Sequence, residues 1–97
     1  MIILREWLEG KMEQVRQAFQ AGRPAALAML LGEIRGALIA RDGNSTEVLT
    51  SIDRLGDAEK AAMRGQLAAA REAFEAAASC IDKLIREGAA QQKAAAG

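Results

Sequence analysis

The stretch that decides the fold is DAEKAAMRGQLAAAREAFEAAASCIDKLIRE, from Asp57 to Glu87. Apolar residues recur along it in alternating steps of four and three, at Met63, Leu67, Ala70, Phe74, Ala77, Ile81 and Leu84. This spacing keeps one face of a helix against a partner. Ala70 and Ala77 are small enough to let a neighbouring backbone come close, and Phe74 fills the space between them. The pattern therefore predicts a long last helix with a coiled-coil-like seam.

The composition predicts an all-α protein with one domain. Of the 97 residues, 51% are hydrophobic and 27% are charged, which is typical of a folded domain. Only 3% are aromatic and there is a single proline, while alanine is abundant, so helices are favoured over strands. We expect one helical domain over residues 1–88 and a frayed, alanine-rich tail over residues 89–97.

Two shorter helices are expected before the long one, over residues 2–21 and 24–41. The inward face of the first carries Leu4, Leu8, Met12, Val15 and Phe19, and that of the second carries Leu27, Leu30, Leu31, Ile34 and Leu38. Gly22 and Pro24 form a short turn between them, as a C-terminal cap and a first helical residue. The two helices should therefore be antiparallel neighbours.

The sequence leaves two alternatives for the third helix: it continues to the end of the domain, or it breaks into two helices. Asn44 and Glu47 resemble a capping box that opens it. The apolar spacing cannot be carried from Leu55 to Met63 without an interruption, and Gly56-Asp57 lies at that point. One alternative is an antiparallel bundle of three helices, whose last helix runs straight and leaves an apolar half uncovered. The other is a bundle of four helices with a break at Gly56-Asp57, which folds back and closes.

The residue inventory argues against catalysis, metal binding and cofactor binding. The chain has no histidine and no tyrosine, and Cys80 is its only cysteine, so the usual bases, nucleophiles and metal ligands are missing. Thirteen basic and thirteen acidic residues give a net charge of zero, and no helix has a basic face that would read nucleic acid. We expect no enzyme, no cofactor, no nucleic-acid partner and no small-molecule substrate. Cys80 is expected to pack beside Ile81.

Neither apolar segment suits a signal peptide or a membrane span. Arg5, Glu6 and Glu9 interrupt the apolar start, and residues 24–40 are too short and carry two charges. We expect a cytoplasmic protein.

The chain has more large apolar residues than its inward faces use. Ile3, Trp7, Met29, Ile39 and Leu49 lie outside the predicted core stripes. One hypothesis is a binding module that receives an amphipathic helix of a partner on these residues and on the seam residues Met63, Leu67, Phe74, Ile81 and Leu84. The alternative is a structural subunit whose seam pairs with a second copy as a homodimer. A closed monomeric bundle, with the five surplus residues in the core or scattered on the surface, is the third interpretation.

One segment carries a family resemblance. AFQAGRPAALAMLLGEIRGALIARDG, residues 18–43, resembles the helix-turn-helix of small bacterial flagellar and type III secretion export chaperones of the FliT and FlgN kind. The shared pattern is a leucine-rich second helix with an acidic and a basic residue, here Glu33 and Arg35, followed by a long helix with leucine and aromatic seam residues. The resemblance implies a chaperone that holds an amphipathic helix of a secreted partner in a groove, without a cofactor.

Overall fold

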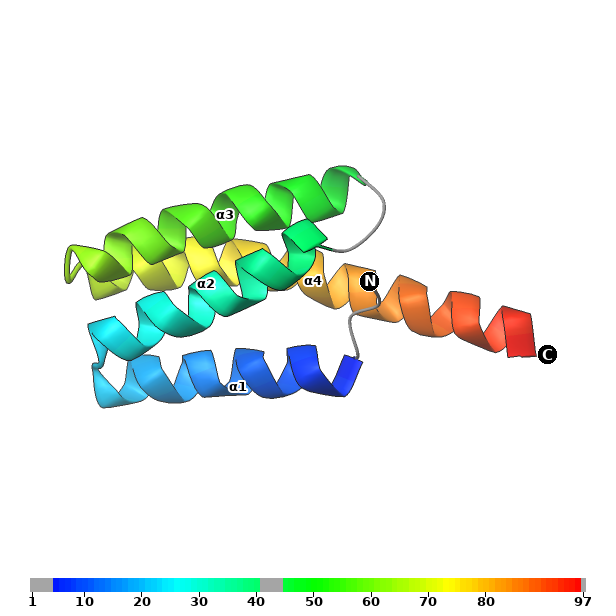
Figure 1. The fold of residues 1–97 in the computed structure, drawn as a ribbon, viewed down its shortest axis with the longest axis horizontal. Helices are drawn as coiled ribbons and strands as arrows, with labels where there is room; N and C mark the ends of the chain where they lie inside the picture. The colour runs from blue at the N-terminus through cyan, green and yellow to red at the C-terminus, as the bar shows by residue number, and fades with distance from the viewer. Residues whose placement is uncertain (1–4, 41–44, 97) are drawn as a thin grey trace.

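The computed structural model describes the backbone of residues 5–40 and 45–96, and the side chains of these residues as far as Arg86. The regular secondary structure of this part is entirely helical, without a strand, which confirms the all-α prediction. The helices are α1 (Arg5–Ala21), α2 (Pro24–Ala40), α3 (Thr46–Met63) and α4 (Leu67–Ala96). Figure 1 shows them arranged as a bundle in which each helix runs antiparallel to the one before it. α2 lies in front between α1 and α3, and α4 passes behind it.

The core is formed by the helix faces that the sequence predicted to point inward. The predicted inward residues of α1 and α2 within the described part are buried: Leu8, Met12, Val15, Phe19, Leu27, Leu30, Leu31, Ile34 and Leu38. Leu4 lies outside the described residues. The rings of Phe19 on α1 and Phe74 on α4 approach to 5.9 Å between centroids, and this contact links the two helices across the bundle. α3 makes its most extensive contact with α4, whereas α1 packs mainly on α2.

The break between the third and fourth helices is not where the sequence predicted it. α3 continues through Gly56 and Asp57 to Met63, so the predicted break at this pair is wrong, and so is the alternative of one uninterrupted last helix. The chain turns at Gly65, whose φ of 73° is a conformation that glycine adopts without steric cost. The Gly65 N–H donates to the Ala62 carbonyl at 3.0 Å, and the Gln66 N–H donates to the Ala61 carbonyl at 2.9 Å. These two bonds form a Schellman motif, which ends a helix.

Alanines explain why α3 does not stop at Gly56. The interruption between Leu55 and Met63 exists only when large apolar residues are counted. Ala58, Ala61 and Ala62 are buried and carry the inward stripe through that interval. Met63 is then the last residue of α3 and not part of α4, so the expected seam does not lie on one helix. Its central members, from Ala70 to Ile81, are buried in this chain's own core.

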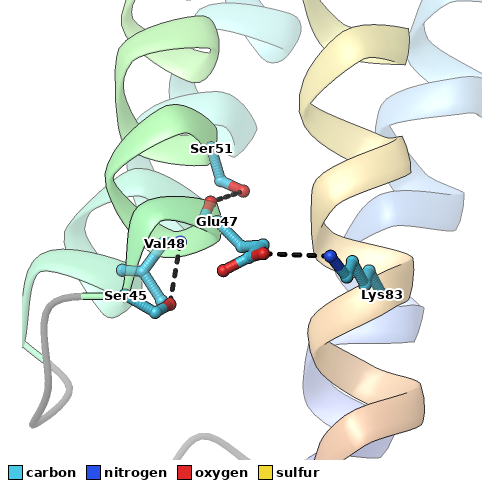
Figure 2. Close-up of polar contacts among 5 residues, drawn as sticks. All are labelled: Ser45, Glu47, Val48, Ser51 and Lys83. Carbon is cyan, nitrogen blue, oxygen red and sulfur yellow. Dashed lines mark hydrogen bonds and ion pairs between the residues drawn. The ribbon is translucent and has the colours of Figure 1, made fainter.

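The start of α3 is held by the polar contacts drawn in Figure 2. Asn44, expected as the cap, lies outside the described residues, and Ser45 occupies the capping position: its Oγ accepts from the Val48 N–H at 3.2 Å. Glu47 is therefore one position too early for a capping box. It faces α4, where the Lys83 Nζ donates to its Oε1 at 3.0 Å. This hydrogen bond, a backbone hydrogen bond and the lysine charge lower the pKa of Glu47.

α4 is longer than expected. It continues to Ala96, whereas the sequence predicted the last helix to end near Glu87. Alanine, glutamine and lysine dominate this extension, and all three favour helix without any tertiary contact. Its C-terminal part projects beyond the other helices in Figure 1. None of the helices, within the residues described, combines the length and apolar character needed to cross a bilayer.

Candidate functional site

The large apolar residues left exposed are the first indication of a site. Within the described part they are Trp7, Met29, Ile39, Leu49 and Met63, with exposed fractions of 38%, 62%, 56%, 50% and 72%. Four of the five residues that the sequence left outside the core are therefore at the surface, and the fifth, Ile3, lies outside the described residues. Exposure alone does not make a site, so their positions on the helices decide whether they form one surface.

An ion pair joins α2 and α3 across their contact. The Arg35 Nε on α2 donates to the Glu59 Oε2 on α3 at 3.0 Å. A Cβ added to Gly32 would meet the Glu59 Oε1 at 3.4 Å, and one added to Gly56 would meet the Arg35 Cδ at 3.9 Å. Each of these two glycines therefore faces the side chain that crosses from the opposite helix. A Cβ at either position would make ordinary van der Waals contact with that side chain, so the ion pair covers both glycines.

Four of the five exposed apolar residues lie on the outward edges of this contact. Residues three or four apart share one face of a helix, so each wall can be followed from the two residues of the ion pair. The wall on α2 consists of Met29, Gly32, Arg35, Gly36 and Ile39, and the wall on α3 consists of Leu49, Ile52, Gly56, Glu59 and Met63. We call this surface the α2–α3 groove. Figure 1 shows that α2 and α3 are antiparallel. Met29 near the start of α2 and Met63 at the end of α3 therefore lie toward one end of the groove, and Ile39 and Leu49 lie toward the other.

A hollow lies on the α3 side of this surface. It is open, has a volume of about 840 Å³, and is lined mainly by α3, including Ile52, Gly56, Glu59 and Met63, with Arg35 as the lining residue from α2. A Cβ added to Gly36 would meet nothing within 4 Å, so the α2 wall is low at that position. The surface thus has apolar ends and a shallow polar centre.

The polar centre presents the guanidinium more than the carboxylate. The Arg35 side chain is 38% exposed, while the Glu59 side chain is 23% exposed and lies against Gly32. Further round α3, the hollow is lined by Asp53, Arg54, Asp57 and Lys60. Their charges balance, so the groove has no strong net field, and any selection of a charged ligand depends on where individual groups lie.

Trp7 does not belong to this groove. Its ring lies under the Lys11 Nζ, 5.7 Å from the ring centroid, and the same Nζ donates to the Glu33 Oε2 of α2 at 2.6 Å. Glu33 and Arg35 are two residues apart and therefore point to nearly opposite sides of α2. The indole lies on the α1 side of α2 and is already partly covered by a lysine.

The predicted seam residues differ in burial, and Met63 is exposed. Phe74 and Ile81 are fully buried, and Leu67 and Leu84 are half-buried. A partner or a second copy could contact Phe74 and Ile81 only if the bundle opened. Cys80 is half-buried beside them, and its thiol is free.

The sequence did not predict a binding role for the residues at the centre of the groove, namely Arg35, Gly36, Ile52, Gly56 and Glu59. A Cβ at Gly32 would make ordinary contact with Glu59, and one at Gly36 would meet nothing within 4 Å. The signal in α3 was present as the spacing of Leu49, Ile52, Gly56, Glu59 and Met63. It could be recognised only after the register with α2 was known.

No group of three or more histidine, cysteine, aspartate or glutamate side chains in the described residues could hold a metal ion. Comparison with protein-family models, with curated proteins and with solved structures finds no match to this chain.

Proposed function

We propose that this protein is a non-enzymatic binding module that receives an amphipathic helix of another protein in the α2–α3 groove. The observation that supports the proposal is the concentration of four of the five exposed large apolar residues on this one surface, at its two ends. Large apolar side chains gathered on a monomer's surface are typical of an interaction site, whereas scattered ones need no explanation.

A helix suits this groove better than an extended chain. Both walls are helices, and a third helix can bury an apolar stripe against two antiparallel helices by ordinary ridge-and-groove packing. An extended peptide would find no strand edge among the described residues with which to pair its backbone groups. Leu49 and Met63 are fourteen residues apart, about 21 Å at a rise of about 1.5 Å per residue. A partner helix of about four turns therefore spans the groove.

The partner that we propose is a different protein and not a second copy. The surface expected to pair two copies was the seam of the last helix, and its central residues are buried within this chain. The resemblance to flagellar and type III secretion chaperones supports an export chaperone or adaptor of the bacterial cytoplasm, whose ligand is an amphipathic helix of a secreted protein.

The test measures binding of a synthetic amphipathic peptide of about four turns by fluorescence anisotropy. We expect saturable binding by the wild-type protein and its loss in Met29→Asp and in Leu49→Asp, which place a charge at opposite ends of the groove. Trp7→Asp changes an exposed apolar residue outside the groove and should keep the binding. Circular dichroism of each variant establishes that the fold is retained.

Two outcomes would contradict the proposal. One is peptide binding that Met29→Asp and Leu49→Asp leave unchanged, or its absence in the wild type. The other is a dimer, observed by light scattering at micromolar concentration, that Met29→Asp dissociates, since this would assign the groove to a second copy.

A filling substitution provides a second arm that does not introduce charge. Gly36→Gln adds a helix-favouring side chain at an open position of the groove, so it should stabilise the fold while blocking the peptide. Gly10→Gln is the matched control, because Gly10 lies in mid-helix on α1 with equally open surroundings. It should give a similar gain in stability and no loss of binding.

A further inference from the structure

Resting on the proposed function, we propose that Arg35 makes the groove selective for a helix with an acidic residue midway between its two apolar anchors. Arg35 lies between Met29 and Ile39 on the α2 wall, and its partner Glu59 lies between Leu49 and Met63 on the α3 wall. A ligand helix that places apolar side chains at both ends must therefore pass directly over the guanidinium.

The Arg35 guanidinium has N–H donors that no acceptor in the described part of the chain satisfies. Its Nε–H donates to Glu59, and Arg35 makes no other hydrogen bond or ion pair within the described part of the chain. An arginine side chain carries five N–H donors in a planar fork, so both Nη groups depend on water in the free protein. A bound helix displaces that water from the groove. Buried donors without an acceptor weaken binding, and a carboxylate of the ligand would satisfy two of them at once.

The surrounding backbone leaves room for such a carboxylate. Gly36 follows Arg35 directly, is exposed, and has open space where a side chain would be. Glu59 is less exposed than Arg35 and is held against Gly32, so the negative end of the pair lies deeper than the positive end. A ligand at the centre therefore meets the guanidinium before it meets the carboxylate, and a basic residue there would face an arginine of the same sign.

The experiment uses three alanine-based helical peptides that differ at one position. Each carries leucines in two clusters about three turns apart, with Glu, Gln or Lys midway. Titration by fluorescence anisotropy at low salt should show that the wild-type protein binds the Glu peptide on the order of tenfold more tightly than the Lys peptide, with Gln between them. Arg35→Gln should abolish the preference for the Glu peptide, and because it leaves the Glu59 carboxylate without its partner, the Lys peptide should then bind at least as tightly as the other two.

The matched control is Arg54→Gln. Arg54 lines the outer side of the same hollow and changes the net charge equally, but it does not lie on the wall of the groove. It should leave the order of the three peptides as in the wild type. If the preference for Glu disappears in Arg54→Gln as much as in Arg35→Gln, the effect is one of net charge and the inference is wrong.

The two proposals fail differently. Equal binding of all three peptides to the wild type overturns the role of Arg35 and leaves the groove as a binding site. Absence of binding by every peptide overturns both. A reversed order in the wild type, with Lys tightest, would assign the recognition to Glu59 and also overturns the inference.

Discussion

The side of α3 that packs on α4 is closed, whereas the edge that meets α2 opens to solvent. On the closed side, the buried alanines of both helices are Ala58, Ala61, Ala62, Ala70, Ala77 and Ala78. On the open edge, Gly32 and Gly56 lie where α2 and α3 meet. The side chains of Arg35 and Glu59 cross between the two helices there. A methyl group fills a helix interface and excludes water. Beside a glycine, the ends of the arginine and glutamate side chains fill the space less completely than a methyl group would. A trough remains between the helices, and the large apolar residues at the two ends of this trough stay exposed.

The largest expected effect separates the core from the groove. Phe74→Ala should lower the free energy of unfolding by about 3–5 kcal/mol, because it empties a fully buried site and removes the ring contact with Phe19. Met63→Ala, on the groove, should change it by no more than about 0.5 kcal/mol. Urea denaturation of both variants tests the comparison. Similar losses in the two variants would mean that the apolar end of the groove is part of the core.

The second expected effect compares two glycines. Gly65→Ala should cost about 1–2 kcal/mol, since φ is positive there and the turn between α3 and α4 depends on it. Gly36→Ala should instead stabilise by about 0.5–1 kcal/mol, because the residue is in mid-helix with no neighbour to clash. Thermal and urea melts measure both. A loss of stability in Gly36→Ala would show that its surroundings are not open.

The smallest expected effect concerns the contact between Glu47, at the start of α3, and Lys83 on α4. The hydrogen bond from Lys83 lowers the pKa of Glu47 in the folded state, so this carboxylate contributes stability above its unfolded pKa of about 4.3 and loses it as the pH falls through the lower folded value. Glu47→Gln should therefore flatten the decline in unfolding free energy on acidification below about pH 5. Urea midpoints between neutral and acidic pH measure it. An unchanged acid profile would mean that the contact in Figure 2 contributes nothing.

Much of the bundle was predictable because local spacing carries it. The inward stripes of α1 and α2 are large residues at helical intervals, and they are buried as expected. The turn at Gly22 was recognised because proline follows closely. Gly65 was missed because Met63 and Leu67 are four residues apart and continue an apparently unbroken stripe across the turn. Gly56 was mistaken for a break because its neighbour Asp57 is a residue typical of a helix cap.

The surplus apolar residues were also recognisable one by one, since each lies off its own helix's inward stripe. Whether they share a surface was not, because Ile39 and Leu49 belong to different helices and the distance between them depends on how α2 and α3 pack against each other. The register of α2 and α3 is a property of the packing between them, in which contacts such as the one between Arg35 and Glu59 join residues more than twenty positions apart.

By itself, the sequence determined that the chain is helical, which residues of α1 and α2 face inward, and that several large apolar residues exceed the need of the core. Periodicity and helix propensity are local properties, so a single chain reveals them. Only the tertiary structure decided that the third helix ends at Met63, that the centre of the expected seam is buried within this chain, and that Met29, Ile39 and Leu49 lie along the contact between α2 and α3 whereas Trp7 does not. Those outcomes depend on which helix lies opposite which, and packing between distant segments sets that choice.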